Sequence, residues 1–527
     1  MSTFKLDGRE IPFEPGDSIM RAAWRQGIEI PHYCWHPGLS VAANCRMCLV
    51  HITSGRQLEM PQLVKDPETG EYRQATKPKL VPACQTPAAD GLEVSSSNEE
   101  VKSAQASVQE FLLLNHPVDC PICDQAGECK LQDYYEEHLH QLKRKRTEPV
   151  HKPKGVRFGP TIVFDAERCI LCTRCVRVCE ELVGDPVLSK RERGNKSEIV
   201  LSPGRQLDHR YTLMTEHVCP VGALTSRDFR FKARVWFLRS ADSVCDGCAR
   251  GCASHADFDP RKGLIERLRP RDDERVNQYW MCDDGMLSYR AQREDRIESA
   301  TIGRGPERRF VSNTNALAEA AAMLRGVESG KLAVVLSAAH STEDNLAMVA
   351  LNKALGGKLF LAARPDWEGD DILRRDDQNP NRKGALLAAG ASELPDLSAL
   401  GEAIREGSIA GVIALGAAAD LDSPASDALK SVPLISLNTH ISELAALADI
   451  VLPVAMHFET EGSFVNFEGF IREFEVVVPP QPAVRPTAEV VASLATGAGI
   501  ALEHRDQRSL RARAREMISE SVTEAGA

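Results

Sequence analysis

LLLNHPVDCPICDQAGECKLQDY, residues 112–134, carries the most distinctive metal-ligating pattern of the chain. Its histidine and three cysteines follow the spacing H-x3-C-x2-C-x5-C: His116, Cys120, Cys123 and Cys129. One imidazole and three thiolates can each bind one iron of a [4Fe-4S] cube, and the neutral imidazole removes one negative charge, which raises the reduction potential in Rieske centres. A zinc knot made by the same four residues is the alternative. The apolar run before His116 predicts a helix.

Cysteines are concentrated in one half of the sequence. The chain has 16 cysteines in 527 residues, and the last of them is Cys282. Clustered thiols followed by a cysteine-free half indicate metal ligation in a reducing compartment more than a disulfide framework. Fifteen of the cysteines, together with His116, sort into four sets.

The first residues predict a small β-rich domain. Thr3–Leu6 and Arg9–Phe13 flank Asp7-Gly8, a dipeptide that favours the tight turn of a hairpin. Asp17 or Ser18 is expected to cap a short helix after the hairpin.

The first set follows this helix in CWHPGLSVAANCRMCLV, residues 34–50, and ends after a long excursion. Its spacing is C-x10-C-x2-C with a distant fourth member: Cys34, Cys45, Cys48 and Cys84. The spacing resembles that of ferredoxin-like [2Fe-2S] domains, with a wider first gap than in the plant type. Small residues at 42–44 would let backbone amides approach the sulfurs. A four-cysteine zinc site is the alternative.

The third set begins in ERCILCTRCVRVCEE, residues 167–181, which approaches the bacterial ferredoxin pattern C-x2-C-x2-C-x3-C-P. Glu180 stands where the proline is expected, whereas Cys219-Pro220 downstream has the Cys-Pro pairing. We therefore assign one [4Fe-4S] cluster to four cysteines: Cys169, Cys172, Cys175 and Cys219. Cys179 is then left over, and we expect it to be a buried structural thiol. A basic linker at 143–160, with Lys152 and Lys154, is interpreted as a solvated connector.

The fourth set has the spacing C-x2-C-x3-C-x29-C and resembles the [4Fe-4S] site near the start of molybdopterin oxidoreductase domains. Its members are Cys245, Cys248, Cys252 and Cys282. A zinc site stays open as the alternative, because C-x2-C pairs serve both chemistries.

The order of the four sets resembles the family of large peripheral-arm iron-sulfur subunits of bacterial NADH-quinone oxidoreductase, the respiratory complex I. The motifs that carry this resemblance lie in residues 1 to about 290: CWHPGLSVAANCRMCLV, NHPVDCPICDQAGEC, RCILCTRCVRVC, HVCPVGAL and CDGCARGC. The resemblance implies an electron relay without catalytic residues of its own, holding one [2Fe-2S] and three [4Fe-4S] clusters, with the fourth cluster set apart from the main path. It also implies as partners an NADH/FMN-binding subunit and other peripheral-arm subunits, at the cytoplasmic face of the inner membrane.

The cysteine-free half predicts an α/β domain with a mostly parallel sheet. Expected strands are 331–337, 358–362, 411–415 and 433–437, with a helix at 342–355. Residues 448–474 resemble the molybdopterin oxidoreductase fold, but no cysteine follows Cys282 to bind molybdenum, so no molybdopterin is expected. The glycines, such as Gly416, are interpreted as ordinary turns. Residues 505–527 form a charged amphipathic tail, either a docking helix or a frayed end.

The predicted fold class is thus α+β ferredoxin-like cluster domains followed by an α/β molybdopterin-oxidoreductase-like domain. The expected boundaries are a β-grasp domain at 1–95, a helical cluster domain at 96–150, a ferredoxin-type domain at 151–240, a cluster segment at 241–300 and a degenerate α/β domain at 301–527. No signal peptide and no membrane span are expected, so membrane attachment would be indirect. The net charge of −11 disfavours a nucleic-acid partner. Two further hypotheses stay open: the cluster-bearing subunit of an NAD-linked formate dehydrogenase or hydrogenase, and a zinc-stapled scaffold.

Overall fold

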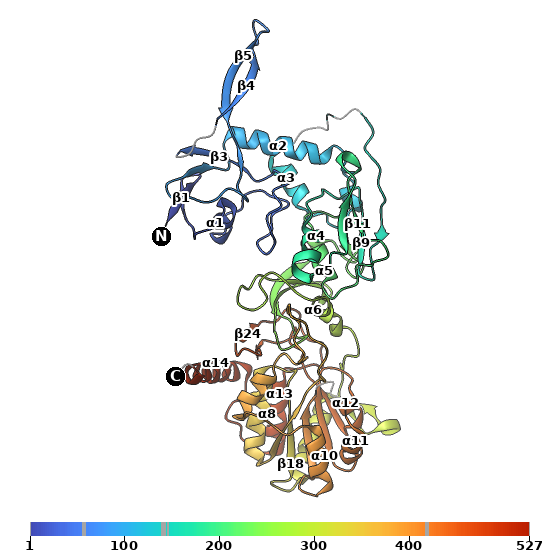
Figure 1. Cartoon of the computed structure of the whole chain (residues 1–527). Helices are drawn as coiled ribbons and strands as arrows, with labels where there is room; N and C mark the ends of the chain where they lie inside the picture. The colour runs from blue at the N-terminus through green and yellow to red at the C-terminus, as the bar shows by residue number, and fades with distance from the viewer. Residues whose placement is uncertain (1, 55–58, 139–143, 145–146, 417–420, 526–527) are drawn as a thin grey trace. The chain divides into compact units, whose positions relative to one another are not determined.

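The computed structural model describes residues 2–54, 59–138, 144, 147–416 and 421–525. Lys143, Lys145 and Arg146 of the basic linker lie outside the described residues. The chain divides into two compact units, Met1–Phe237 and Leu238–Ala527 (Figure 1). No helix in the described part of the chain is long and apolar enough to cross a membrane.

The first unit is built from short elements joined by long loops. Its helices and helical turns are α1 (Ile19–Arg25), α2 (Glu99–Leu113), η1 (Cys120–Ile122), α3 (Lys130–His138), α4 (Arg174–Arg177), the π-helical turn η2 (Val178–Val183), η3 (Gly194–Lys196), α5 (Thr212–His217) and η4 (Val235–Phe237). Its strands are β1 (Thr3–Leu6), β2 (Arg9–Pro12), β3 (Leu49–Ser54), β4 (Glu59–Lys65), β5 (Tyr72–Pro78), β6 (Val81–Pro82), β7 (Glu93–Ser95), β8 (Val156–Arg157), β9 (Ile162–Phe164), β10 (Leu188–Arg191), β11 (Glu198–Leu201) and β12 (Leu224–Ser226).

A five-stranded sheet opens the first unit, in the order β2-β1-β7-β3-β6. The predicted hairpin is confirmed: β1 and β2 pair antiparallel, and Asp7 and Gly8 both have positive φ. The predicted helix also forms, and the cap is Ser18, whose side chain accepts a hydrogen bond from the Arg21 N–H. The apolar residues of α1 pack on this sheet in one core.

The excursion between Cys48 and Cys84 contains a second hairpin, β4–β5, that no sequence pattern predicted. It runs away from the five-stranded sheet as an isolated two-stranded ribbon in the first unit (Figure 1). Leu63 and Tyr72 on this ribbon are exposed, so its stability comes mainly from its own ladder of hydrogen bonds.

The second unit holds the larger regular core. Its helices and helical turns are α6 (Asp283–Leu287), η5 (Ser288–Gln292), η6 (Gly305–Glu307), α7 (Asn313–Gly326), α8 (Thr342–Leu355), α9 (Arg382–Ala389), α10 (Leu397–Arg405), α11 (Ser423–Lys430), α12 (Glu443–Leu447), α13 (Thr487–Ala498) and α14 (Gln507–Ala525). Its strands are β13 (Arg239–Val244), β14 (Ala253–Asp259), β15 (Leu264–Pro270), β16 (Thr301–Ile302), β17 (Arg309–Phe310), β18 (Leu332–Ser337), β19 (Lys358–Ala362), β20 (Gly411–Leu415), β21 (Leu434–Asn438), β22 (Ile450–Pro453), β23 (Gly462–Val465) and β24 (Ile471–Phe474).

The main sheet of this unit has seven strands in the order β17-β16-β22-β21-β20-β18-β19. Strands β18 to β22 pair parallel, and only β16 and β17, at one end of the sheet, pair antiparallel. The predicted α/β class with a mostly parallel sheet is confirmed. Strand β21 begins at Leu434 and not at Pro433, because proline has no N–H to donate to the ladder.

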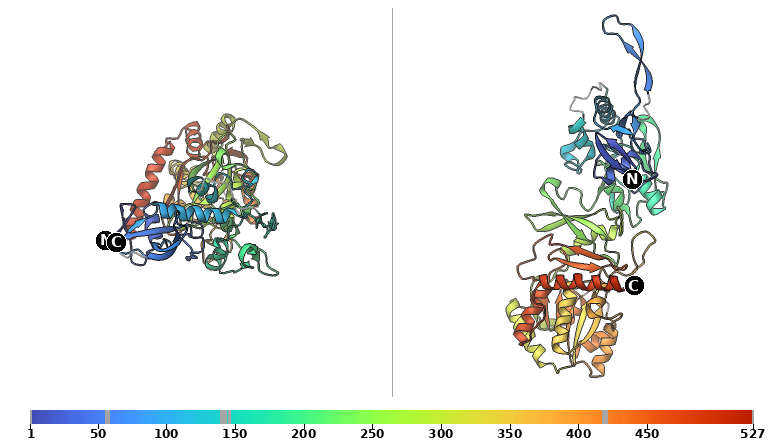
Figure 2. Two further views of the ribbon diagram at one scale, coloured as in Figure 1. Left: turned by 90° about the horizontal axis from the view of Figure 1, so that it is seen from above. Right: turned by 90° about the vertical axis from the view of Figure 1, so that its left-hand side faces the viewer.

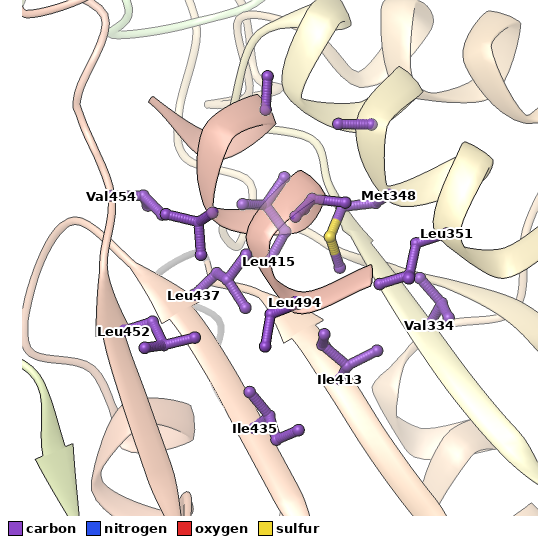
Figure 3. Close-up of a cluster of buried hydrophobic side chains, with 14 of the residues drawn as sticks. Val334, Met348, Leu351, Ile413, Leu415, Ile435, Leu437, Leu452, Val454 and Leu494 are labelled. Atoms are coloured by element: carbon purple, nitrogen blue, oxygen red, sulfur yellow. The ribbon is translucent and has the colours of Figure 1, made fainter. Parts of the chain in front are cut away.

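Alternate residues of the parallel strands pack on opposite faces of the sheet. On one face, Val334, Ile413 and Ile435 form a core with Met348 of α8 and Leu494 of α13 (Figure 3). On the other face, the neighbouring strand residues pack against α10, α11 and α12. The sheet is therefore covered on both faces, as the continuous apolar runs of its strands predict.

The charged C-terminal segment is a helix that packs on its own unit. Leu510, Ala514 and Ile518 of α14 are buried in the core beneath it, and the helix contacts α8 and α9 (Figure 2). Arg511 lies 2.6 Å from both Glu461 and Glu475. The alternative of a frayed end is wrong for the tail up to Ser519, since buried apolar side chains at every fourth position anchor this part of the helix.

Candidate metal centres

The four thiols of the first set are brought together by the loop after α1, the start of β3 and the end of β6. They hydrogen-bond in two pairs, Cys34 with Cys45 and Cys48 with Cys84. The bond from Cys34 lowers the pKa of Cys45 to about 5, and the bond to Cys84 raises the pKa of Cys48. Two pairs of thiols match a [2Fe-2S] cluster, in which each iron takes two thiolates.

Backbone amides surround these sulfurs, as the small residues of the loop predicted. The N–H groups of Asn44 and Cys45 approach the Cys34 sulfur, and that of Met47 approaches the Cys45 sulfur. Ala43 has a positive φ of 50°, which turns the chain around the site. Amide hydrogen bonds favour the thiolate form that binds iron.

The second set gathers three thiols around η1 and the start of α3. Burial raises the pKa of Cys129 to about 11, and the neighbouring thiols Cys123 and Cys120 act on it in the same direction. The amides of α3's first turn donate to the Cys129 sulfur. His116 is partly buried in the loop between α2 and η1. Its role as the fourth ligand stays a prediction.

The third set surrounds α4, and its distant member follows α5. Burial raises the pKa of Cys175 strongly, and the thiols of Cys172, Cys169 and Cys219, followed by that of Cys179, add to this rise. Leu171 and Thr173 have positive φ, so the chain winds tightly between the cysteines, and the Leu171 N–H lies 3.4 Å from the Cys169 sulfur. The structure therefore places Cys219 among the three close cysteines.

Cys179 lies on the π-helical turn η2 and is fully buried. Its sulfur is 3.6 Å from Nε2 of His209. Burial, followed by Asp185 and Glu180, raises its pKa to about 12. This environment is that of a neutral, packed thiol, as predicted.

The fourth set lies in the second unit, on the loop between β13 and β14 and at the N-cap of α6. All four thiols are buried. Burial raises the pKa of Cys245 strongly, and Cys252 and Cys282 add to the rise. A Cβ atom at Gly285 would lie 3.0 Å from the Cys245 sulfur and 3.5 Å from that of Cys282, so this glycine sits between two of the thiols.

Across the described residues, no group of three or more His, Cys, Asp or Glu side chains closes around a single metal ion.

The second and third sets are joined directly. The Lys130 N–H, next to Cys129, donates to the Pro220 carbonyl, next to Cys219, at 3.0 Å. A Cβ atom at Gly222 would lie 2.3 Å from the Cys123 sulfur.

An ion pair adds a second link between these sets. Arg168 donates twice to the Asp119 carboxylate, at 3.1 and 2.7 Å, and each residue directly precedes a cysteine of its own set. Lys154 lies 2.9 Å from Glu167 and 3.3 Å from Asp119, while Lys152 donates to the Ser197 carbonyl. The Lys154 side chain is 41% exposed, as the interpretation of this linker as a solvated connector predicts, whereas Lys152 is partly buried and departs from it.

Sequence reasoning missed the arginines inside the third motif. Arg174 and Arg177 lie between the cysteines and reach the loops of both the first and the third set. Two basic residues at a spacing of three within a cysteine run were the signal that could have found them.

A cavity of about 190 Å³ opens at the carboxyl ends of β18, β20, β21 and β22. His340, His440 and His457 line it together with Asp246, which directly follows Cys245. Burial lowers the pKa of His440 to about 4. Gly416 also lines the cavity, and a Cβ atom there would lie 2.1 Å from the Asn438 side chain. Interpreting Gly416 as an ordinary turn glycine is therefore wrong, since close packing requires it.

Four family models match the chain. They are described as a 2Fe-2S iron-sulfur cluster binding domain (residues 1–99), the NADH-ubiquinone oxidoreductase-G iron-sulfur binding region (105–143), the ferredoxin-like domain of NADH-quinone oxidoreductase subunit 3 (159–225) and molybdopterin oxidoreductase (311–496).

Curated relatives match most of the chain. The NADH-quinone oxidoreductase G subunit of Streptomyces coelicolor is 34% identical over 57% of this chain and 33% of the relative. The G subunit of the Rickettsia felis enzyme is 31% identical over 71% of this chain and 52% of the relative. NADH-quinone oxidoreductase subunit 3 of Thermus thermophilus is 34% identical over 67% of this chain and 46% of the relative. The matched region thus spans between a third and about half of these relatives' length.

Proposed function

Because the iron-sulfur part of this chain belongs to the G-subunit family of NADH-quinone oxidoreductases, we propose that the chain is an electron-relay subunit of such a complex. It would take electrons from an NADH/FMN-binding subunit and pass them toward quinone. Other peripheral-arm subunits would be its neighbours, and they would attach it indirectly to the cytoplasmic face of the inner membrane.

The proposed cofactors are one [2Fe-2S] and three [4Fe-4S] clusters, without molybdopterin. The ligands are Cys34, Cys45, Cys48 and Cys84; His116, Cys120, Cys123 and Cys129; Cys169, Cys172, Cys175 and Cys219; and Cys245, Cys248, Cys252 and Cys282. Bound clusters supply one-electron chemistry whose potential depends on ligands, hydrogen bonds and burial. The chain's own part is to supply thiolates, to aim amides at them and to bury them. Each of the five segments expected from the sequence would form one domain of this electron-relay subunit.

The observation that carries the proposal is the contact between ligand loops of different sets. The residue after Cys129 hydrogen-bonds to the residue after Cys219, and Gly222 packs against the Cys123 sulfur. Tyr33, next to Cys34, is buried within electrostatic reach of Cys45 and Cys129, so the first and second sets are also neighbours. A relay needs such proximity between centres, whereas sites that only staple a scaffold do not.

Anaerobic purification of the assembled complex tests this proposal. We expect iron and acid-labile sulfide in this chain, with paramagnetic resonance signals of both cluster types that appear when NADH is added. A chain that holds zinc and no iron would favour the scaffold hypothesis instead. Molybdenum or tungsten in the second unit would favour the formate dehydrogenase hypothesis.

A further inference from the structure

Two arginines on the short helix α4 lie between two of the proposed metal centres. Arg174 and Arg177 are three residues apart, a spacing that puts both side chains on one face of a helix. Arg177 is only 7% exposed, and Arg174 is partly buried. Burying a guanidinium is costly unless its charge and its donors find partners.

Each guanidinium joins a loop of the first set to a loop of the third set. Arg177 donates to the carbonyl of Cys34 at 2.5 Å and to that of Cys172 at 3.4 Å, and it also bonds the Ser40 carbonyl. Arg174 donates to the carbonyl of Val218 at 3.1 Å and to that of Trp35. Four of these five carbonyls belong to a cysteine or to its immediate neighbour in the sequence.

The acceptors of both arginines are neutral carbonyl oxygens. Within the described ranges, neither guanidinium has a carboxylate closer than 4.0 Å. Two positive charges therefore lie without a carboxylate partner beside the loops that carry Cys34, Cys172 and Cys219. Thiolate-ligated clusters carry net negative charge, and that charge grows by one on reduction.

The two guanidinium charges would stabilise the more negative, reduced form of a neighbouring cluster more than its oxidised form, because opposite charges attract more strongly as the cluster gains an electron.

We propose that Arg174 and Arg177 are positioning residues that raise the reduction potentials of the clusters held by the first and third sets and fix the distance between them. The inference rests on the proposed relay function. Positive charge between two negative centres also offsets their mutual repulsion when both are reduced. The two arginines thereby favour the reduced state of the clusters held by the first and third sets.

Redox titration of the assembled complex, followed by paramagnetic resonance, tests the role of the charge. Arg177→Gln removes the charge but keeps a donor. At a fixed ambient potential, we expect at least a tenfold lower ratio of reduced to oxidised cluster at the first and third sets, which is about 59 mV for a one-electron couple. The fourth set, in the other unit, should not change. Equal shifts at all centres, or no shift, would overturn the proposal.

Two matched variants separate charge from structure. Arg177→Lys keeps the positive charge, so its clusters should have reduction potentials close to those of the wild type. A lysine variant with the lower potentials of the glutamine variant would refute the charge effect. Arg205→Gln is the control, because Arg205 is half-exposed and pairs with Asp185 in the same unit. It should leave all potentials unchanged.

Arg174 provides a second test of the proposal if the Arg177→Gln variant does not retain its clusters. Arg174→Gln breaks only the bonds to Trp35 and Val218, and the same tenfold change is expected there. If both glutamine variants lose the clusters, Arg177→Lys must retain them at wild-type potentials, and their loss there too would overturn the proposal. Absence of both signals from the wild-type complex would instead contradict the proposed function.

Discussion

Gly222 occupies a position at which any side chain would collide with a proposed ligand. A Cβ atom there would lie 2.3 Å from the Cys123 sulfur and 3.0 Å from Cβ of Gln125. Gly222→Ala should displace Cys123 and lower the occupancy of the second cluster, at a cost of about 1–3 kcal/mol in stability from overpacking. The amplitude of that cluster's resonance signal, relative to the [2Fe-2S] signal, measures the effect.

Gly326→Ala is the control for this change. A Cβ atom at Gly326 has no heavy atom within 4 Å. The control should keep every cluster. A normal second-cluster signal in Gly222→Ala would show that the Cys123 sulfur does not need its observed position.

We expect opposite effects of serine substitutions at Cys219 and Cys179 on the cluster signal, although both residues lie near the third set. Both thiols add to the rise in the pKa of Cys175, but the Cys179 sulfur lies 3.6 Å from Nε2 of His209, whereas the Cys219 sulfur lies 3.0 Å from the Val221 carbonyl oxygen. Cys219→Ser should abolish the ferredoxin-type [4Fe-4S] signal. Cys179→Ser should keep it and cost about 1 kcal/mol from the altered buried contact. Loss of the signal in Cys179→Ser alone would reverse the ligand assignment.

At the scale of elements, Glu343 ties the first turn of α8 to β23. Its carboxylate accepts hydrogen bonds from the Ser463 N–H at 2.7 Å and from the Ser463 hydroxyl at 3.0 Å. Burial raises its pKa from 4.5 to about 7. The folded state therefore binds this proton more tightly than the unfolded state, so the contribution to stability is complete below pH 4.5 and is lost as the pH rises through 7.

Glu343→Gln should remove this pH dependence. At pH 8 the variant should be more stable than the wild type by up to about 3 kcal/mol, since each pKa unit corresponds to about 1.4 kcal/mol. Near pH 4, below the pKa of the unfolded chain, the two proteins should be nearly equal. Urea unfolding at both pH values measures the difference, with Glu319→Gln on the exposed face of α7 as control. A variant less stable at pH 8 would mean that the ionised carboxylate is stabilised by its bonds to Ser463.

Elements of the second unit were predicted closely. Helix α8 and strands β19 and β20 have the expected bounds, because buried parallel strands are continuous apolar runs and α8 begins at a capping box formed by Ser341 and Asp344. Hairpin β4–β5 was not predicted, since its residues are largely polar and it packs on no core that would impose an apolar pattern.

At the scale of the whole molecule, the two units depend differently on metal. In the first unit, three thiol sets lie in loops and in the short helices η1 and α4, while the core of the main sheet in the second unit contains no cysteine. Metal binding contributes folding free energy where ligand loops have little other structure. Removal of iron by an anaerobic chelator should therefore loosen the first unit locally.

Hydrogen exchange before and after chelation measures this effect. Peptides covering residues 116–134 and 167–222 should lose protection by at least tenfold, whereas peptides of β18, β20 and β21 should exchange as before and serve as the internal reference. Equal loss of protection in the sheet peptides would show that the whole chain depends on its clusters.

The amino-acid pattern alone predicts the candidate metal ligands and the class of the fold. Cysteine spacing is local: in C-x2-C-x2-C the thiols of Cys169, Cys172 and Cys175 are close in the chain, and no distant residue is needed to recognise them. Periodicity is local as well, so the strands and helices of the second unit followed from it.

Contacts between distant groups depend on the packing of the whole fold. Cys84 and Cys219 could be assigned from their motifs, but Arg174 and Arg177 contact carbonyls from loops more than forty residues away in either direction, which no motif indicated. A side chain's partners across the fold depend on how whole elements pack, and that packing depends on the combined burial of many residues. The candidate thiol ligands could therefore be predicted from the sequence, while the arginine charges that surround them could be identified only in the folded structure.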